Sequence, residues 1–148
     1  MPLSIYAGPT ALARIREQGL TPALFSHVLG ASGGPKWFVL AGIDRILFPA
    51  FFAESSQPVN VIGSSAGAFR SACFVQRDPV AAINRLAENY SQTVYSPKPG
   101  PGEITHKARE LIDYVMGRNG VMEVLTNRRF KLHVIAARCH GLMQHYGR

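Results

Sequence analysis

The stretch VNVIGSSAGAFR, residues 59–70, joins a short apolar run to a segment of helical character through five small residues. Residues 59–63 have the length and composition of a buried strand, and residues 68–76 read as a helix. Between them, GSSAG at residues 63–67 matches the pattern G-x-S-x-G. That pattern is typical of a sharp turn from strand to helix that exposes its central side chain, here Ser65.

The residue types in this turn suit a nucleophile. The central residue of such a turn takes a strained backbone conformation, so bulky neighbours would collide. Gly63 and Gly67 are therefore expected to form the elbow around Ser65, with the strand ending near Gly63 and the helix beginning near Ala66. The positive end of that helix would favour a developing oxyanion. An ordinary glycine-rich turn remains the alternative.

A second glycine-rich turn, GASGGPKW at residues 30–37, also follows an apolar strand pattern and precedes a helical one. It is not a Walker phosphate loop, because Pro35 and Trp37 stand where that motif requires glycine and serine or threonine. The spacing also differs from G-x-G-x-x-G. The loop would supply backbone N–H donors to an oxyanion, or it is simply a tight turn.

Strand and helix patterns alternate along the chain, which predicts an α/β fold. The expected strands are residues 23–30, residues 59–63, and residues 130–139, the last apolar on both faces as inside a parallel sheet. Four further helices are expected. The first is capped by Thr10 and ends at Gly19, and the second begins at Pro35, with Trp37, Leu40, Ile43 and Leu47 facing the core. The third is capped by Asp78 and carries Ile83, Leu86, Ala87 and Tyr90 on one face, and the fourth carries Leu111, Ile112, Val115 and Met116 and ends at Gly117.

Composition narrows the possible functions. The 148 residues fit one domain, and their net charge of +7 would favour an anionic partner, either a lipid surface or a nucleic acid. The basic residues are scattered, however, which is more typical of a solvated surface. No nucleic-acid-binding signature is present, so no nucleic-acid partner is expected. Cys73 and Cys139 give neither metal spacing nor a disulfide framework, so no metal or cofactor is expected and both thiols should be buried. No signal peptide or membrane span is recognised, which predicts a cytoplasmic or peripheral membrane protein.

The two glycine turns together resemble the patatin-like phospholipase family. Its G-G-G-x-[RK]-G loop corresponds here to Gly33-Gly34-Pro35-Lys36, and its G-x-S-x-G elbow corresponds to residues 63–67. The resemblance implies a three-layer α/β/α sandwich with a mainly parallel sheet, and hydrolysis of lipid acyl esters by a Ser–Asp dyad without histidine. Ser65 would be the nucleophile, Gly33 and Gly34 the oxyanion donors, and Lys36 the basic residue of the loop. Ser32 and Trp37 depart from the glycines of that loop.

The dyad aspartate of the family lies in a D-G-[GA] motif, which this chain lacks. Its aspartates are Asp44, Asp78 and Asp113, and none precedes glycine. We therefore expect residues 1–148 to be a single, partial patatin-like domain, truncated at its C-terminus and inactive alone, since a serine without a base is a weak nucleophile.

Three alternatives remain open. A Ser-Asp-His esterase would use His133, His140 or His145 as its base, all of which follow the serine. A lipid- or partner-binding module would keep the loop but not the catalysis. A member of the family could also transfer the acyl group to an acceptor other than water.

Overall fold

The structure, a computed structural model, describes residues 4–138 and residue 140, and it confirms the α/β fold class. In the first half of the chain the elements are α1 (Pro9–Gln18), the 3₁₀ turn η1 (Pro22–Leu24), β1 (His27–Gly30), the 3₁₀ segment η2 (Gly34–Leu40), α2 (Ala41–Leu47), the 3₁₀ turn η3 (Phe51–Glu54) and β2 (Val59–Gly63). The second half contains α3 (Ala66–Phe74), α4 (Pro79–Gln92), α5 (Pro101–Met116), α6 (Gly120–Thr126) and β3 (Phe130–Val134).

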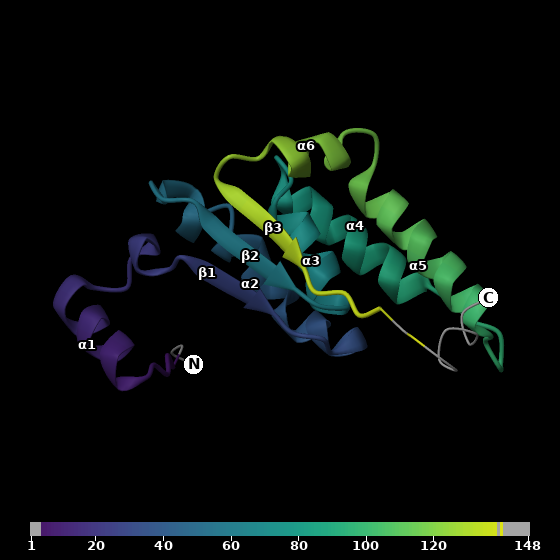
Figure 1. The fold of residues 1–148 in the computed structure, drawn as a ribbon, viewed down its shortest axis with the longest axis horizontal. Helices are drawn as coiled ribbons and strands as arrows, with labels where there is room; N and C mark the ends of the chain where they lie inside the picture. The colour runs from purple at the N-terminus through teal and green to yellow at the C-terminus, as the bar shows by residue number, and fades with distance from the viewer. Residues whose placement is uncertain (1–3, 139, 141–148) are drawn as a thin grey trace.

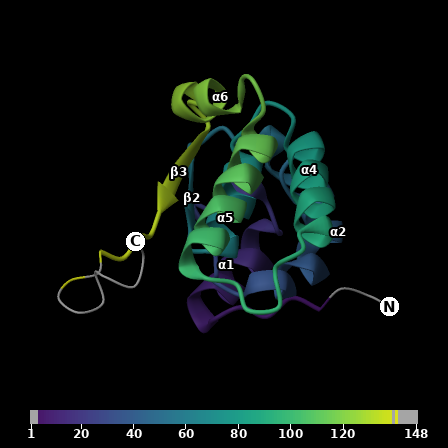
Figure 2. The ribbon, with the colours of Figure 1, turned by 90° about the vertical axis from the view of Figure 1, so that its right-hand side faces the viewer.

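The three described strands form one parallel sheet in the order β1-β2-β3. Its register pairs Gly30 with Gly63 and Gly63 with Val134, so the strands end together at one edge. Helix α3 packs against all three strands, α4 against α3, and α5 against α4. These helices lie on one side of the sheet (Figures 1 and 2). The arrangement is compatible with two layers of an α/β/α sandwich.

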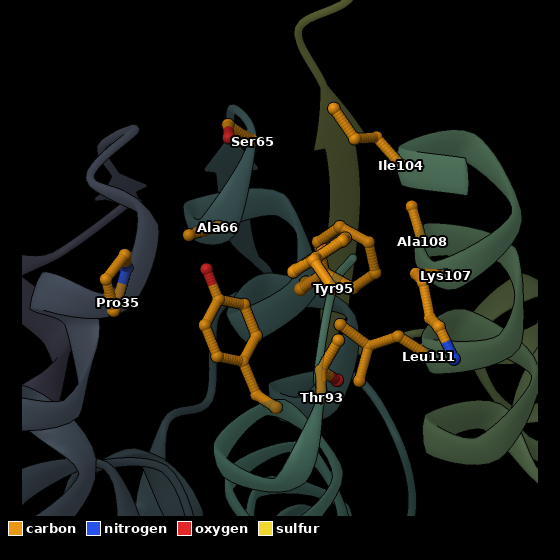
Figure 3. A pocket seen from close by; sticks show the side chains of 11 residues that line it. Pro35, Ser65, Ala66, Thr93, Tyr95, Ile104, Lys107, Ala108 and Leu111 are labelled. Carbon is orange, nitrogen blue, oxygen red and sulfur yellow. The ribbon is translucent and has the colours of Figure 1, made fainter. Parts of the chain in front are cut away.

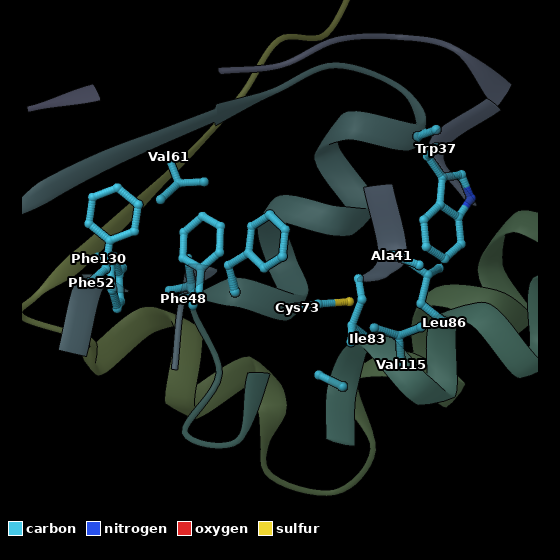
Figure 4. Close-up of a cluster of buried hydrophobic side chains, with 14 of the residues drawn as sticks. Trp37, Ala41, Phe48, Phe52, Val61, Cys73, Ile83, Leu86, Val115 and Phe130 are labelled. Atoms are coloured by element: carbon cyan, nitrogen blue, oxygen red, sulfur yellow. The ribbon is translucent and has the colours of Figure 1, made fainter. Parts of the chain in front are cut away.

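The core lies between the sheet and these helices (Figure 4). At one end Phe48 stacks on Phe74, with ring centroids 3.7 Å apart, and Phe52 and Phe130 pack around them. The other end is formed by Trp37 with smaller apolar side chains from α3, α4 and α5. These smaller residues include Cys73, Ile83, Leu86 and Val115.

Most of the predicted helix ends are confirmed. The Asp78 side chain caps α4 by accepting a hydrogen bond from the Ala81 N–H at 2.9 Å. Helix α5 ends before Gly117, whose φ of 55° lies in the left-handed region that glycine tolerates. Helix α1 ends before Gly19 as predicted, but Thr10 is not its cap: the helix already begins at Pro9.

The predicted core face of residues 35–47 is wrong in part. Trp37 is buried, but Leu40 and Ile43 are exposed, and the buried positions are instead Ala41, Asp44 and Phe48. The segment begins as a 3₁₀ helix, which has three residues per turn, and becomes α-helical only at Ala41. The buried positions Trp37, Ala41, Asp44 and Phe48 follow one another by four, three and four residues, which is helical spacing with its face turned by about one residue from the predicted one, and Asp44 on this face pairs with Arg70 of α3.

The expectation that residues 130–139 form a strand apolar on both faces is also wrong. Strand β3 is shorter and lies at the edge of the described sheet, where Lys131 and His133 are exposed. On β1 the same face carries Leu29, which is 75% exposed. No described helix covers this face of the sheet. Its side chains therefore remain in solvent, although parallel sheets are usually buried on both faces.

Candidate active site

The predicted turn at Ser65 is confirmed. Strand β2 ends at Gly63, and α3 begins at Ala66. Ser65 has φ 52° and ψ −126°, and among the described residues no other non-glycine residue has a positive φ. Such a conformation costs about 1–3 kcal/mol and persists only where the surroundings enforce it. The Ser65 side chain does not cap the helix, so its hydroxyl is left for other partners.

Close backbone packing explains why the flanking residues are glycines. A Cβ on Gly63 would lie 2.5 Å from the Gly67 carbonyl oxygen and 2.6 Å from the Ala68 Cα. A Cβ on Gly67 would collide with the Gly30 carbonyl group. Gly30 in turn has room for only a hydrogen, since a Cβ there would lie 2.9 Å from the Gly67 oxygen. Gly30 is thus a third structural glycine of the elbow, which the sequence motif does not include.

The glycine loop lies beside the elbow, as predicted, because β1 and β2 are neighbours. The Ser64 N–H donates to the Gly30 carbonyl at 3.1 Å. The hydroxyls of Ser32 and Ser64 lie 2.6 Å apart and hydrogen-bond to each other. Ser64, the other serine of the motif, is therefore engaged in holding the two loops together.

The three predicted loop residues have different surroundings. Gly34 has φ 52°, in the left-handed region that favours glycine, whereas Gly33 has φ −173°, which any residue can adopt. Lys36 is exposed and is not among the residues that line the cavity at Ser65. Pro35 does line that cavity. The oxyanion role of Gly33 and Gly34 stays a prediction.

Ser65 lies at a cavity of about 330 Å³ between the two loops and helices α4 and α5 (Figure 3). Its walls are mostly apolar. The lining consists of Pro35, Ser65, Ala66, Phe69, Tyr90, Thr93, Tyr95, Ile104, Lys107, Ala108 and Leu111. Motif reasoning identified Ser65 but none of the α5 residues, since their relation to it arises only from tertiary packing. The volume falls in the range typical of small-molecule pockets.

None of the described aspartates is among the residues that line the cavity. Asp44 is 1% exposed and forms a two-pronged ion pair with Arg70 of α3. Asp78 caps α4, and Asp113 is exposed on α5. Among the described residues, no acidic side chain hydrogen-bonds to the Ser65 hydroxyl. The described structure therefore supplies no base for this serine.

The histidines do not provide one either within the described residues. The ring of His133 hydrogen-bonds through Nε2 to the Asn60 side-chain oxygen at 2.9 Å on the uncovered face of the sheet. His140 is exposed, and His145 lies outside the described residues. His133 thus bonds to a neighbouring strand residue and not to the serine turn.

The sequence also predicted that the Cys73 thiol is buried and that no segment spans a membrane. Cys73 is fully buried, as predicted, and burial raises the pKa of its thiol to about 12, while Cys139 lies outside the described residues. No group of three metal-binding side chains occurs among the described residues. None of the helices described here combines the length and hydropathy that crossing a membrane requires.

Comparisons of the chain with protein-family models, with curated proteins and with solved structures gave no match. The interpretation of the site therefore depends on its residues and geometry.

Proposed function

We propose that Ser65 is the nucleophile of a serine acyl-ester hydrolase that acts on lipid esters. The observation that supports this most strongly is the strained Ser65 conformation at the end of β2, beside an apolar cavity. Strain of this kind is concentrated at functional sites because it fixes a reactive group in place. The resemblance of the two glycine turns to patatin-like phospholipases points to the same chemistry.

In the proposed reaction the Ser65 oxygen attacks the ester carbonyl carbon, and the carbonyl oxygen becomes negatively charged. The Ala66 N–H is the first of α3 and has no backbone acceptor among the described residues, so it is available to that oxygen. Gly33 and Gly34 would add further N–H donors. A base from outside the described residues accepts the Ser65 hydroxyl proton and passes it to the departing alcohol. Water then hydrolyses the acyl-serine, which releases the free acid and restores the Ser65 hydroxyl.

The cavity lining favours an acyl chain as the group bound beside Ser65. Phe69, Ile104, Ala108 and Leu111 present apolar surface, and each buried methylene of a ligand is worth about 0.8 kcal/mol. Lys107 is the cationic residue of the lining. Together with the net charge of +7, it favours a substrate presented at an anionic lipid surface.

The second candidate function is a lipid-binding module without catalysis. The specific observation in its favour is that the described residues provide no base for Ser65. In that case the cavity would bind a fatty acyl group, and Ser65 would not react.

Incubation with p-nitrophenyl esters of increasing chain length, and with a phospholipid, separates these candidates. We expect slow turnover by the 148-residue chain, since general-base assistance is typically worth about 10²–10⁴-fold. Mass spectrometry should nevertheless find the acyl group on the peptide that contains Ser65, and Ser65→Ala should remove it.

Ser64→Ala is the matched comparison for the site of acylation, because it removes the adjacent hydroxyl, and with it the bond to Ser32, but leaves the Ser65 hydroxyl in place. The acyl group should still be found at Ser65, even where the altered loop contact slows its formation. Acylation that persists in Ser65→Ala would contradict the proposal. Binding of fatty acid without any acyl-serine would favour the lipid-binding module, and acyl transfer to added glycerol would favour an acyltransferase.

A further inference from the structure

Tyr90 brings a hydroxyl group to the same cavity as Ser65. It lies in the last turn of α4 and lines the cavity together with Pro35 and Ala66. Its hydroxyl oxygen lies 3.9 Å from the position that a methyl group on Gly34 would occupy. The hydroxyl therefore lies near Gly34 of the glycine loop, and its residue lines the same cavity as Ser65.

Two aromatic rings hold the Tyr90 ring in place. Trp37 meets it edge to face at 5.9 Å between ring centroids, and Phe38 does so at 5.7 Å. Trp37 and Phe38 also stack on each other at 4.4 Å, and Trp37 is only 4% exposed. Edge-to-face pairs are favourable and orient both rings. The tryptophan that replaces a glycine of the family's loop thus has a structural role here: it supports Tyr90.

The Tyr90 hydroxyl is available to a ligand. No described residue hydrogen-bonds to it. Burial, followed by the influence of Tyr95, raises the pKa of Tyr90 above its ordinary value, so the group stays protonated at neutral pH. A phenol in this state is a hydrogen-bond donor. Because its ring is fixed by packing, the donor is already positioned before a ligand arrives.

We infer that Tyr90 is a further oxyanion donor, whose hydroxyl hydrogen-bonds to the carbonyl oxygen of an ester bound at Ser65. This inference rests on the function proposed above. As the Ser65 oxygen bonds to the carbonyl carbon, the π electrons of the C=O bond move onto its oxygen. Tyr90 keeps its proton and stabilises that negative oxygen, because hydrogen bonds to charged acceptors are about twice as strong as neutral ones. The substrate expected at this cavity is a carboxylic ester with an apolar acyl chain.

Hexylboronic acid tests the inference without requiring turnover. The Ser65 oxygen adds to boron, and the hydroxyl proton passes to the buffer, giving a tetrahedral boronate anion that mimics the intermediate. Boron NMR distinguishes this tetrahedral species from the free trigonal acid. The measured quantity is the dissociation constant of the adduct at constant pH for the wild-type chain and three variants.

Tyr90→Phe keeps the ring and its contacts with Trp37 and Phe38 but removes the hydroxyl. It should weaken the adduct about 10- to 100-fold, the effect of losing one hydrogen bond to a charged group. Tyr114→Phe removes a tyrosine hydroxyl of α5 that bonds to Glu88 outside this lining, and it should bind like the wild type. Ser65→Ala should form no tetrahedral adduct. Thermal unfolding should show that both tyrosine variants remain folded.

The outcomes separate the inference from the proposed function. Equal adduct affinity in the wild type and Tyr90→Phe would overturn the role of Tyr90 and leave Ser65 as the nucleophile. Equal weakening in Tyr90→Phe and Tyr114→Phe would also overturn it, because the loss would then be a general effect of removing a tyrosine hydroxyl. Absence of any Ser65-dependent adduct in the wild type would overturn the proposed function and the inference with it.

Discussion

Ser65 keeps an unfavourable backbone conformation because three glycines allow the chains around it to pack without side chains between them. Gly30, Gly63 and Gly67 bring the end of β1, the end of β2 and the first turn of α3 into direct backbone contact. The Ser64 N–H donates to the Gly30 carbonyl across the same junction. The position of the Ser65 side chain therefore depends on close backbone contacts, which are possible only because these three glycines have no Cβ atom.

A methyl group at Gly67 should therefore be far more damaging than one at a helical glycine with open surroundings. We expect Gly67→Ala to lower the free energy of unfolding by about 3 kcal/mol, because its Cβ overlaps the Gly30 carbonyl. Gly42→Ala, in α2, has nothing within 4 Å of the new Cβ and should raise stability by up to about 1 kcal/mol. Urea unfolding of both variants measures the difference. Equal effects would show that the backbone contact at Gly67 does not exist in solution.

Helices α2 and α3 are joined by a buried ion pair, which also fixes the face that α2 turns inward. Asp44 is 1% exposed, and both of its oxygens accept hydrogen bonds from Arg70. The Arg70 guanidinium also lies 5.4 Å from the centre of the Phe74 ring. A buried carboxylate is tolerated only when it is paired, so the two helices must keep this relative position.

Removing one partner of this ion pair should lower the free energy of unfolding more than replacing both partners with apolar residues. Arg70→Met leaves the Asp44 carboxylate buried and unpaired, and we expect it to lower the free energy of unfolding by about 3–5 kcal/mol. The double variant Asp44→Leu, Arg70→Met should be clearly more stable than that single variant, since no buried charge remains. Denaturant unfolding of the wild type, the two single variants and the double variant gives the coupling free energy between Asp44 and Arg70. Glu110→Gln removes the acid of the exposed pairs with His106 and Lys107 and should change stability little.

Within the described residues, helices cover one face of the sheet and leave the other face open. Along β2, buried residues alternate with partly buried ones. The buried residues, Val59, Val61 and Gly63, face the helices. The opposite face carries exposed side chains from β1 and β3, including Leu29 and His133, and partly buried ones from β2. Stability should therefore depend almost entirely on the helix-covered face, because only that face removes apolar surface from water.

This asymmetry predicts opposite outcomes for two truncations in neighbouring strands. Val61→Ala, at a fully buried position, should lower the free energy of unfolding by about 2 kcal/mol. Leu29→Ala, at a position that is 75% exposed, should change it by less than about 0.5 kcal/mol. Urea unfolding of dilute samples measures both. A large loss in Leu29→Ala would mean that this face is covered in solution.

The sequence alone determined the local features whose cause lies within a few residues. The order of small residues at 63–67 specified the turn at Ser65, and Asp78 followed by Pro79 specified the start of α4. Gly117 specified the end of α5. In each case a hydrogen bond, a cap or a φ angle involves residues adjacent along the chain, so the pattern can be interpreted without knowing the fold.

Only the tertiary structure decided which distant residues meet. The role of Gly30 depends on Gly67, the burial of Asp44 depends on Arg70, and the place of Tyr90 at the cavity depends on Trp37 and Phe38. The phase of residues 35–47 and the edge position of β3 likewise departed from local expectation. These features follow from packing between separate elements, where shape and charge on one element select the partner on another, and no local period in the sequence encodes that selection.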